Sequence, residues 1–299
     1  MAERSSTGGR QSQAAGRQVP RRKVALVTGA NSGIGKAAAA GLARAGFDVT
    51  LVVRNRQRGE AAIAEIRSVA PEANLSLLVV DLSSQRSIRA GAAAFLRDHD
   101  SLDVLVNAAG VFLRDRSETE DGIERTFATN YLAYFLLAHQ LLPALTRAGP
   151  SRVVNLASRY GSTRIDFDDM MMKTRKYTFF KAVAPTMVAR VLFTQELAER
   201  LKGTGIVVNA VHPGFVSHTQ LLSEVGGFFR WMTNTFGKSP EVGADTVVWL
   251  ATSPEGATVT GKLWTKRKPL KTPGQGSDPA ARRRLWEESE RLTGVTGWP

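Results

Sequence analysis

The sequence Val24-Ala-Leu-Val-Thr-Gly-Ala-Asn-Ser-Gly-Ile-Gly35 joins a short apolar run to a glycine-rich turn, and an alanine-rich helical segment follows it. The apolar run predicts a buried β-strand. In the turn, Gly29 permits a tight bend, Gly33 lets the backbone approach a pyrophosphate, and Gly35 allows close packing of the helix. A purely structural turn is the alternative. The order strand, turn and helix favours the start of a dinucleotide-binding domain instead.

Extended and helical patterns alternate after this turn. Apolar runs at 48–55, 75–82 and 103–110 are separated by helical segments at 56–69 and 85–98. This alternation predicts an α/β fold with a single Rossmann-type, doubly wound parallel sheet of about seven strands and helices on both faces.

Length and composition indicate one large domain. The chain has 299 residues, of which 43% are hydrophobic, and we place the domain at 23–292. Residues 1–22 are rich in Ser, Gly, Gln and Arg and predict a disordered basic segment, and 293–299 form a tail. No apolar run approaches the roughly 18 residues that span a bilayer, so we expect a soluble, cytoplasmic protein without a membrane span. Cysteine is absent, which excludes disulfides and thiolate chemistry.

The formal net charge is +13, and much of it lies near the two ends of the chain. A nucleic-acid partner would require a folded basic stripe, preferably with interleaved aromatic residues. Solvated ends and a pocket for an anionic cofactor explain the charge more simply. We therefore predict a small-molecule substrate and no nucleic-acid partner.

Polar residues at the ends of predicted strands indicate which cofactor is bound. Arg54 stands where an NAD-specific protein usually has a carboxylate, and a guanidinium there suits a 2′-phosphate. A solvated arginine is the alternative. Asn31 and Ser32 add donors to the turn, and Asp81 is placed to accept from the adenine amino group. The cofactor predicted is NADP(H).

Several motifs follow one another in order: Thr28-Gly29-x3-Gly33-x-Gly35, Asn107-Ala-Ala-Gly110, Asn130, Ser158 and His212-Pro-Gly214. Through them, residues 23–292 resemble the short-chain dehydrogenase/reductase family. The wording RVVNLAS and RLWEESERLTG is similar to its retinol-dehydrogenase-like branch. The resemblance implies hydride transfer between nicotinamide C4 and a carbonyl or alcohol carbon. It also implies that Ser158 polarises the carbonyl and that Asn130 anchors a water to the family's lysine.

The resemblance extends the candidate sites to the following residues. Predicted cofactor-binding residues are Gly29, Asn31, Ser32, Gly33, Ile34, Gly35, Arg54, Asn55, Asp81, Leu82, Asn107, Ala108, Ala109, Gly110, Pro213, Gly214 and Val216. Predicted substrate-pocket residues are Ser158, Tyr160, Val183, Met187, His212 and Phe215, and predicted catalytic residues are Ser158, Asn130, Tyr177 and Tyr160.

The family's tyrosine and lysine lie four residues apart on the helix after the serine, and two registers compete here. Tyr177 and Lys181 match the spacing literally. The downstream run KAVAPTMVARVLFTQEL (181–197) instead places Val183 and Met187 at these positions without a gap, and we favour this register. The tyrosine position differs by six residues between the two registers, from 177 to 183, and six residues on a helix correspond to about 9 Å of rise and about 240° of rotation. We also expect Pro185 to mark the first helical turn, with residues 177–181 in a loop.

Without that tyrosine, the proton must come from another acid. Candidates are Tyr177, Tyr160, His212 and an acidic phenol of the substrate itself. The alternative for Tyr160 is a pocket wall, and for His212 a satisfied loop histidine.

Two further segments bear on the substrate. The insertion at 161–176 contains Asp166, Asp168 and Asp169, but no additional ligand pattern, so no metal is predicted. The methionines 170–172 are adaptable apolar groups that could line a large pocket. A substrate lid is predicted around 217–237, whose aromatic residues suit a flat aromatic ligand.

The sequence therefore predicts an atypical NADP(H)-dependent carbonyl reductase. Its predicted substrate is a bulky aromatic or polyketide-like secondary metabolite, as in antibiotic biosynthesis, with substrate-assisted protonation. A non-redox cyclase, isomerase or lyase on the same fold is one alternative, and a non-catalytic partner subunit of an active sibling is another. A homodimer through the long helices at 117–146 and 183–202 is the assembly considered.

Overall fold

The computed structural model describes residues 21–159, 163–216, 237–272 and 274–298. Their strands form one eight-stranded sheet in the order β3-β2-β1-β4-β5-β6-β7-β8, which confirms the predicted α/β class. The strands are β1 Val24–Thr28, β2 Asp48–Val53, β3 Leu75–Val79, β4 Val104–Asn107, β5 Ser151–Leu156, β6 Ile206–Val211, β7 Leu263–Thr265 and β8 Lys268–Leu270. Strand β1 pairs in parallel with both β2 and β4, so the strand order reverses there.

Seven of the strands pair in parallel, in agreement with the predicted sheet of about seven, and one antiparallel edge strand is added to them. Strand β8 returns antiparallel to β7 and extends the sheet at its edge. Between them, Lys266 and Arg267 have φ of 48° and 58°. Left-handed residues at both central positions are typical of a tight hairpin turn, usually signalled by Asn-Gly. Lys-Arg carries no such signal, so the sequence pattern missed this hairpin.

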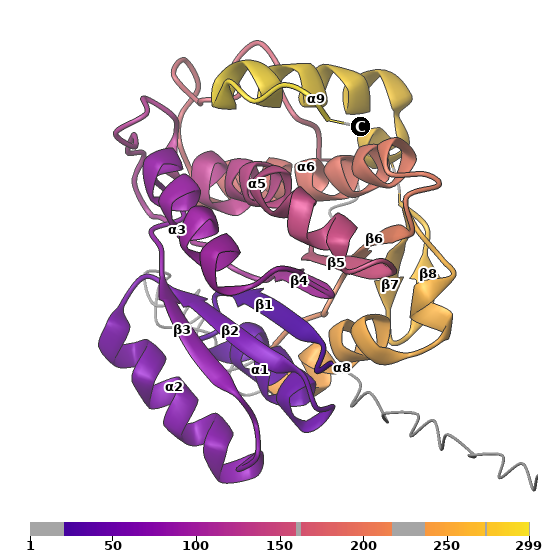
Figure 1. Ribbon diagram of the computed structural model, residues 1–299. Coiled ribbons are helices and arrows are strands. Elements are labelled where there is room, and N and C mark those ends of the chain that lie inside the picture. Colours follow the sequence, from indigo (N-terminus) through magenta and orange to yellow (C-terminus); the bar gives the residue numbers. More distant parts are fainter. Residues whose placement is uncertain (1–20, 160–162, 217–236, 273, 299) are drawn as a thin grey trace, which may run out of the picture.

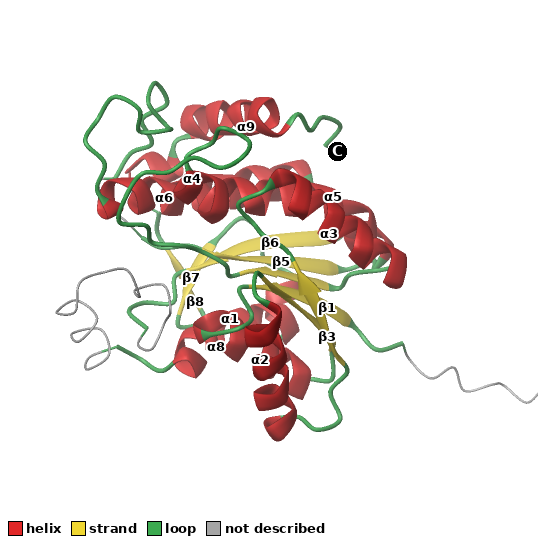
Figure 2. Cartoon of the chain, turned by 90° about the vertical axis from the view of Figure 1, so that its left-hand side faces the viewer, coloured by secondary structure: helices red, strands yellow, loops and turns green. Residues whose placement is uncertain are grey.

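Helices cover both faces of the sheet (Figures 1 and 2). On one face lie α1, α2 and α8, and their apolar side chains form one buried cluster with the strands. On the other face lie α3, α5 and α6, which form a second cluster. The helices are α1 Gly33–Arg44, α2 Arg56–Val69, α3 Gln85–Asp98, α4 Arg125–Phe127, α5 Ala133–Arg147, α6 Phe179–Arg200, α8 Pro240–Thr252 and α9 Pro279–Thr293. Short turns of 3-10 helix occupy Glu255–Ala257 (η3) and Gly274–Ser277 (η4).

The long helix expected before β5 is divided by a π-helical turn. After the single turn α4, the π-helical turn η1 spans Ala128–Leu132 and leads directly into α5. Such π turns are rare and often occur at functional sites. The predicted residue Asn130 lies in this turn.

Helix α6 does not begin at Pro185, as the sequence suggested. It begins at Phe179, six residues earlier, and Thr178 caps it by accepting from the backbone N–H of Lys181. Pro185 lies inside the helix. The surrounding burial of α6 between the sheet and α9 outweighs the loss of one helical hydrogen bond.

Helix α9 adds a further layer outside α5 and α6 (Figure 2). Trp286 on α9 is 1% exposed, and its ring centroid lies 5.0 Å from that of Phe135 on α5 and 6.2 Å from that of Phe193 on α6. Trp298, in the predicted tail, packs on Trp286 at 4.8 Å. The outer face of the two long helices considered for a homodimer is therefore occupied by the chain's own C-terminal segment.

The described chain is held in place from its first residues. The Arg21 guanidinium donates two hydrogen bonds to Asp103, at 2.7 and 2.9 Å, and Arg22 lies 3.5 Å from Asp48. The ordered domain thus begins before the predicted boundary at residue 23. Residues 1–20 lie outside the described part.

Candidate active site

The glycine turn contacts the end of β4. Gly29 has φ +66°, and a Cβ there would lie 2.9 Å from Cα of Ala109, which excludes larger residues. A Cβ on Gly35 would lie 2.7 Å from the carbonyl carbon of Gly29. The hydroxyl of Thr28 accepts from the N–H groups of Ala108 and Ala109, at 2.9 and 3.1 Å. The structure therefore joins two predicted cofactor-binding segments at the carboxyl edge of the sheet.

The N-terminus of α1 suits an anion. Ser32 is its N-cap residue, and its hydroxyl makes no capping hydrogen bond to the first turn of α1. The first-turn N–H groups of a helix lack intrahelical partners and carry partial positive charge. Asn31 and Ser32 are half-buried beside them. Such a helix terminus binds phosphate groups well.

Two apolar residues of the predicted set, Ile34 and Val216, lie close to Gly243 of α8. A Cβ on Gly243 of α8 would lie 2.8 Å from a methyl group of Val216 and 3.2 Å from Cγ1 of Ile34. The segment after β6 and the first turn of α1 therefore both pack near the same glycine of α8. Gly214, at φ +78°, follows Pro213 and turns the chain toward this contact.

The adenine end of the predicted set lies at the ends of β2 and β3. Arg54 is exposed directly after β2. Asn55 instead caps α2, where its side-chain oxygen accepts from Arg58 N at 3.0 Å. Asp81 Oδ1 accepts from the N–H and hydroxyl of Ser83 at 2.9 and 2.8 Å, and Leu82 is buried. Asn55 and Asp81 thus have structural partners already.

A network of buried amide side chains links the ends of β4 and β5 to α6. Asn107 is completely buried and donates to Asn155 on β5 at 2.9 Å. Asn155 donates to the hydroxyl of Thr194 on α6 at 3.0 Å. This network fixes the ends of β4 and β5 against α6. The half-buried Gly110 and Ser158 follow the two strands.

His212 follows β6 and is half-buried. Its backbone N–H donates to Trp264 O at 2.8 Å. Burial lowers the pKa of its imidazole, and the positive charges of Arg159 and Lys238 lower it further. The ring is therefore neutral at neutral pH. Because Ala157 N bonds to Val211 O at 2.8 Å, His212 and Ser158 follow directly on paired residues.

Asn130 holds backbone on both sides of the π-helical turn. Its side chain donates to Val111 O at 2.9 Å and accepts from Val111 N at 2.7 Å. Its own backbone carbonyl accepts from Nε of Arg190. The side-chain amide is thus committed to the segment after β4.

Val183 and Met187 are both buried on α6, at 2% and 5% exposure. One turn further along, Arg190 is only 4% exposed. Sequence reasoning missed this residue. The signal was a single charged residue in the apolar run Met187-Val-Ala-Arg-Val-Leu-Phe193.

The literal Tyr-x-x-x-Lys match does not form one helical face. Tyr177 precedes α6, and its hydroxyl is bonded to Thr126 Oγ1 at 2.9 Å and to Glu124 at 3.4 Å. Burial raises its pKa to about 12, and Glu124 contributes to the increase. Lys181 is exposed in the first turn of α6.

Two predicted features lie outside the described residues: Tyr160 and residues 217–236 of the lid. Phe215, just before the lid, is 74% exposed. Among the described residues, no group of three or more His, Cys, Asp or Glu could hold a metal ion. In the same part of the chain, no helix has the length and apolar character needed to cross a membrane.

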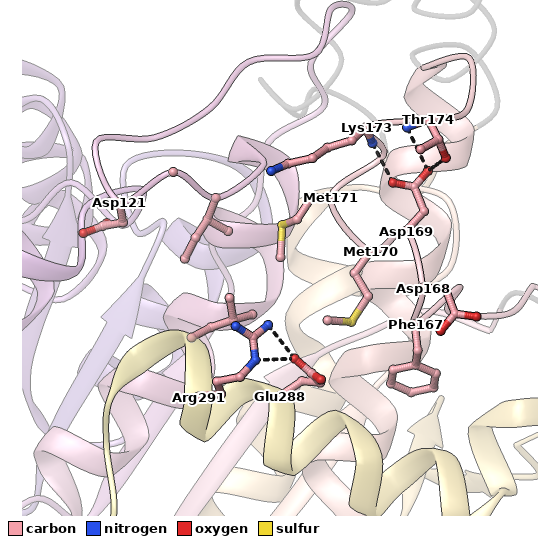
Figure 3. Close-up of a pocket in the computed structure, with 13 residues that line it drawn as sticks. Asp121, Phe167, Asp168, Asp169, Met170, Met171, Lys173, Thr174, Glu288 and Arg291 are labelled. Atoms are coloured by element: carbon pink, nitrogen blue, oxygen red, sulfur yellow. Dashed lines mark hydrogen bonds and ion pairs between the residues drawn. The ribbon is translucent and has the colours of Figure 1, made fainter.

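A cavity of about 540 Å³ opens between the insertion before α6 and helix α9 (Figure 3). Met170 and Met171 line it together with Phe167, whereas Met172, the third of the predicted pocket methionines, is buried elsewhere. Its rim is charged, and Glu288 pairs there with Arg291. None of the predicted cofactor residues lines this cavity. Asp169 is bonded within its own loop, to Lys173 N and Thr174 Oγ1.

Several known proteins are similar to this chain in sequence and fold. A family model described as short chain dehydrogenase matches residues 23–227. Human retinol dehydrogenase 13 is 40% identical over 282 residues, which cover 91% of this chain and 85% of that protein. A solved structure of an uncharacterised Mycobacterium paratuberculosis protein aligns with a TM-score of 0.75 and 30% identity, covering 93% of this chain and 95% of that chain. Pseudomonas aeruginosa RhlG, in an NADP active-site complex, aligns with a TM-score of 0.65 and 26% identity, covering 82% and 94%.

Proposed function

This chain belongs to the short-chain dehydrogenase family of NAD(P)(H)-dependent oxidoreductases, and we propose that it transfers a hydride between NADP(H) and the carbonyl carbon of a bulky apolar compound. The observation that carries the proposal is the contact of the glycine turn with the end of β4, where Gly29 leaves room for Ala109. This is the point where the strand order reverses, the usual place for a dinucleotide in such sheets. The N-terminus of α1 suits its pyrophosphate.

The preference for NADP(H) rests on Arg54. A guanidinium at the end of β2 provides charge-assisted hydrogen bonds to a 2′-phosphate, whereas a carboxylate there would repel it. Arg54 is exposed, so it can reach a ligand without displacing a core contact. That RhlG was solved with NADP adds support by analogy.

Ser158 is the group proposed to bind the reacting oxygen. Bound NADPH supplies the hydride that reduces the carbonyl carbon. The Ser158 hydroxyl donates a hydrogen bond to the carbonyl oxygen and stabilises the negative charge that develops on it. A proton must then reach this oxygen to complete the alcohol.

The proton donor is proposed to be the substrate's own acidic hydroxyl. Val183 and Met187 carry no acid, and the Tyr177 phenol is bonded to Thr126 with a pKa raised to about 12. His212, neutral because its pKa is lowered, holds no spare proton as an imidazolium, and the other candidate, Tyr160, lies outside the described residues. A phenol next to the carbonyl would protonate the new alkoxide within the pocket.

Aromatic side chains support a bulky apolar substrate. Phe112 and Phe179 lie with ring centroids 5.7 Å apart, Phe180 stands beside Phe179 at 3.9 Å, and Phe180 and Phe215 are 52% and 74% exposed. Relatives named for retinol, a bulky apolar alcohol, point to the same class. A polyketide-like aromatic ketone remains the prediction for a substrate that supplies its own acid.

Binding and turnover measurements test the proposal. The purified protein is titrated with NADPH and with NADH, and then NADPH consumption is followed with retinal and with an ortho-hydroxyaryl ketone. We expect tighter binding of NADPH, and faster reduction of the hydroxyaryl ketone than of its O-methyl ether, by about 100-fold. Equal rates of reduction for the hydroxyaryl ketone and its O-methyl ether would contradict substrate-assisted protonation. Absence of NADPH binding would remove the proposed function.

The apolar residues at positions 183 and 187 are also compatible with two alternatives. A non-redox cyclase, isomerase or lyase, or a non-catalytic partner of an active sibling, would not need the tyrosine and lysine. Product formation without net loss of NADPH would identify the first, and activity only with a sibling chain would identify the second.

Assembly and location remain predictions. A homodimer through 117–146 and 183–202 would have to displace α9 or use surfaces that α9 leaves open, because Trp286 packs on both helices. Sedimentation of the full chain and of Trp286→Ala would reveal such a dimer. Cytoplasmic location is tested by fractionating cells into membrane and cytosol.

A further inference from the structure

Arg190 places a charged group inside an otherwise apolar stretch of α6. It is 4% exposed, and burial of a charge costs free energy unless hydrogen bonds compensate it. The guanidinium remains protonated at any physiological pH. We therefore expect the buried guanidinium of Arg190 to have a structural or functional role that offsets this cost.

The guanidinium binds backbone carbonyls from three different elements. Nε donates to Asn130 O in the π-helical turn. Nη1 donates to Leu156 O, the last residue of β5, at 3.1 Å, and Nη2 donates to Ala109 O, just after β4, at 2.9 Å. Its Cζ also lies 4.3 Å from the ring centroid of Tyr134. One side chain thus ties two strand ends to a helix.

Each of these carbonyls belongs to a segment of the candidate site. Ala109 is the residue against which the Gly29 turn packs, with no room for a Cβ between them. Tyr134 also donates to Ala109 O, at 2.7 Å, so this carbonyl is held by two donors. Leu156 precedes Ser158 by two residues. Arg190 therefore contacts the backbone that sets both the cofactor turn and the serine.

Met187 lies beside the same cation. Its sulfur is 3.5 Å from Nη1 of Arg190, and the two residues are one helical turn apart. A lysine at position 187 would bring a second positive charge next to the guanidinium. An apolar residue at 187 and an arginine at 190 are thus compatible, whereas two buried cations are not.

We propose that Arg190 is a positioning residue: it fixes the ends of β4 and β5 for cofactor and substrate, and its buried charge favours negative charge on the reacting oxygen. This inference rests on the proposed function. The effect of the charge reaches the site through a low-dielectric interior, where it is screened less than in water. The strand ends are fixed by the hydrogen bonds from Arg190 to the carbonyl oxygens of Ala109 and Leu156.

The test compares Arg190→Met and Arg190→Lys with a matched control, Arg152→Met. Arg152 is a half-buried arginine on β5 that also donates to a backbone carbonyl, Leu250 O at 2.8 Å. We expect Arg190→Met to weaken NADPH binding by about 10-fold, to lower kcat by about 100-fold, and to shift the pH profile of kcat. Arg190→Lys keeps the charge, so its pH profile should match wild type while NADPH binding is still weakened. The control Arg152→Met should leave NADPH binding, kcat and the pH profile of kcat unchanged.

Two results would overturn the role of Arg190. One is that Arg190→Lys binds NADPH as tightly as wild type. The other is that Arg190→Met loses only stability, as the control does, with an unchanged pH profile. Should Arg190→Met fail to fold, Arg190→Lys carries the comparison.

A second pair of variants tests the coupling to Met187. Met187→Lys should bind NADPH at least about 10-fold more weakly than wild type. Met187→Lys combined with Arg190→Asn still lacks the hydrogen bonds to Ala109 and Leu156, but its loss of affinity should be smaller than the sum of the two single losses in free energy, because only one cation is then buried. A loss of affinity in the double variant that equals the sum of the two single losses in free energy would contradict the coupling. If wild type itself binds no NADPH, the proposed function fails first, and this outcome is distinct from a failure confined to the variants.

Discussion

Replacing Tyr177 by phenylalanine tests which register of the tyrosine and lysine motif operates. The change removes the hydroxyl bonded to Thr126 at 2.9 Å and to Glu124 at 3.4 Å. Glu124 is 1% exposed and accepts from the backbone N–H groups of Thr126 and Phe127, at 2.8 and 2.7 Å. The phenol therefore belongs to a structural cap at the start of α4.

The expected loss is modest and concerns stability. One net hydrogen bond contributes about 1 kcal/mol, while the ring keeps its packing. Tyr177→Phe should lower the free energy of unfolding by about 1 kcal/mol and Tm by roughly 2 °C. Initial rates of NADPH consumption should stay within about twofold of wild type, because this phenol does not exchange the substrate proton.

The pH dependence has a defined sign. Burial raises the pKa of Tyr177 from 10.0 to about 12 in the folded protein. The stability contributed by the neutral phenol is therefore complete below about pH 10 and is lost as pH rises toward 12. The stability difference between wild type and variant should be constant near neutrality and should shrink in that alkaline window.

Tyr131→Phe is the matched control. The Tyr131 hydroxyl, in the π-helical turn η1, pairs with Ser289 on α9 at 2.6 Å in the buried core, so Tyr131→Phe should lose stability without loss of activity. A fall in kcat of about 100-fold or more in Tyr177→Phe, absent from the control, would refute the favoured register. Urea unfolding followed by tryptophan fluorescence and steady-state kinetics provide both measurements.

Three further substitutions test the cofactor site and the C-terminal layer. Gly35→Ala forces a Cβ to within 2.7 Å of a backbone carbon and should weaken NADPH binding in a fluorescence titration by at least about 10-fold. Gly41→Ala is its control: the three atoms nearest to the added Cβ all belong to the side chain of Val248 on α8, so NADPH binding should be unchanged. Arg54→Ala should weaken NADPH by about 10-fold and leave NADH unchanged; equal losses for both would contradict a 2′-phosphate contact. Trp286→Ala should lower the free energy of unfolding in urea by about 3–5 kcal/mol, and a loss under about 1 kcal/mol would contradict tight packing of α9.

The sequence predicted those parts of the fold that depend on local pattern. Strand, glycine turn and helix between Val24 and Arg44 follow from apolar periodicity and from glycine's conformational freedom, and Gly29 shows the close approach that the pattern implied. Helices α2 and α3 were placed at their observed bounds. Features set by tertiary contact were missed. The π-helical turn depends on Asn130 binding Val111 and Arg190, which are distant in sequence.

The candidate site shows the same division. Spacing along the chain identified the glycine turn, Asn107 and Ser158, because strand ends carry them to one edge of the sheet. Spacing alone could not place Tyr177, since its hydroxyl is directed by Glu124 and Thr126, more than 50 positions earlier. Nor could it assign Arg190, whose partners come from three elements. Docking of α9 on the long helices likewise required the packing of Trp286.

The most direct test of the account follows the hydride itself. The protein is incubated with NADPH that carries deuterium at both hydrogen positions of nicotinamide C4 and with a bulky carbonyl substrate, and the alcohol is analysed by mass spectrometry. We expect one deuterium on the carbinol carbon for each NADPH consumed, and a rate reduced by about 100-fold or more in Ser158→Ala. Product without deuterium, or deuterium transfer unaffected by Ser158→Ala, would contradict this expectation.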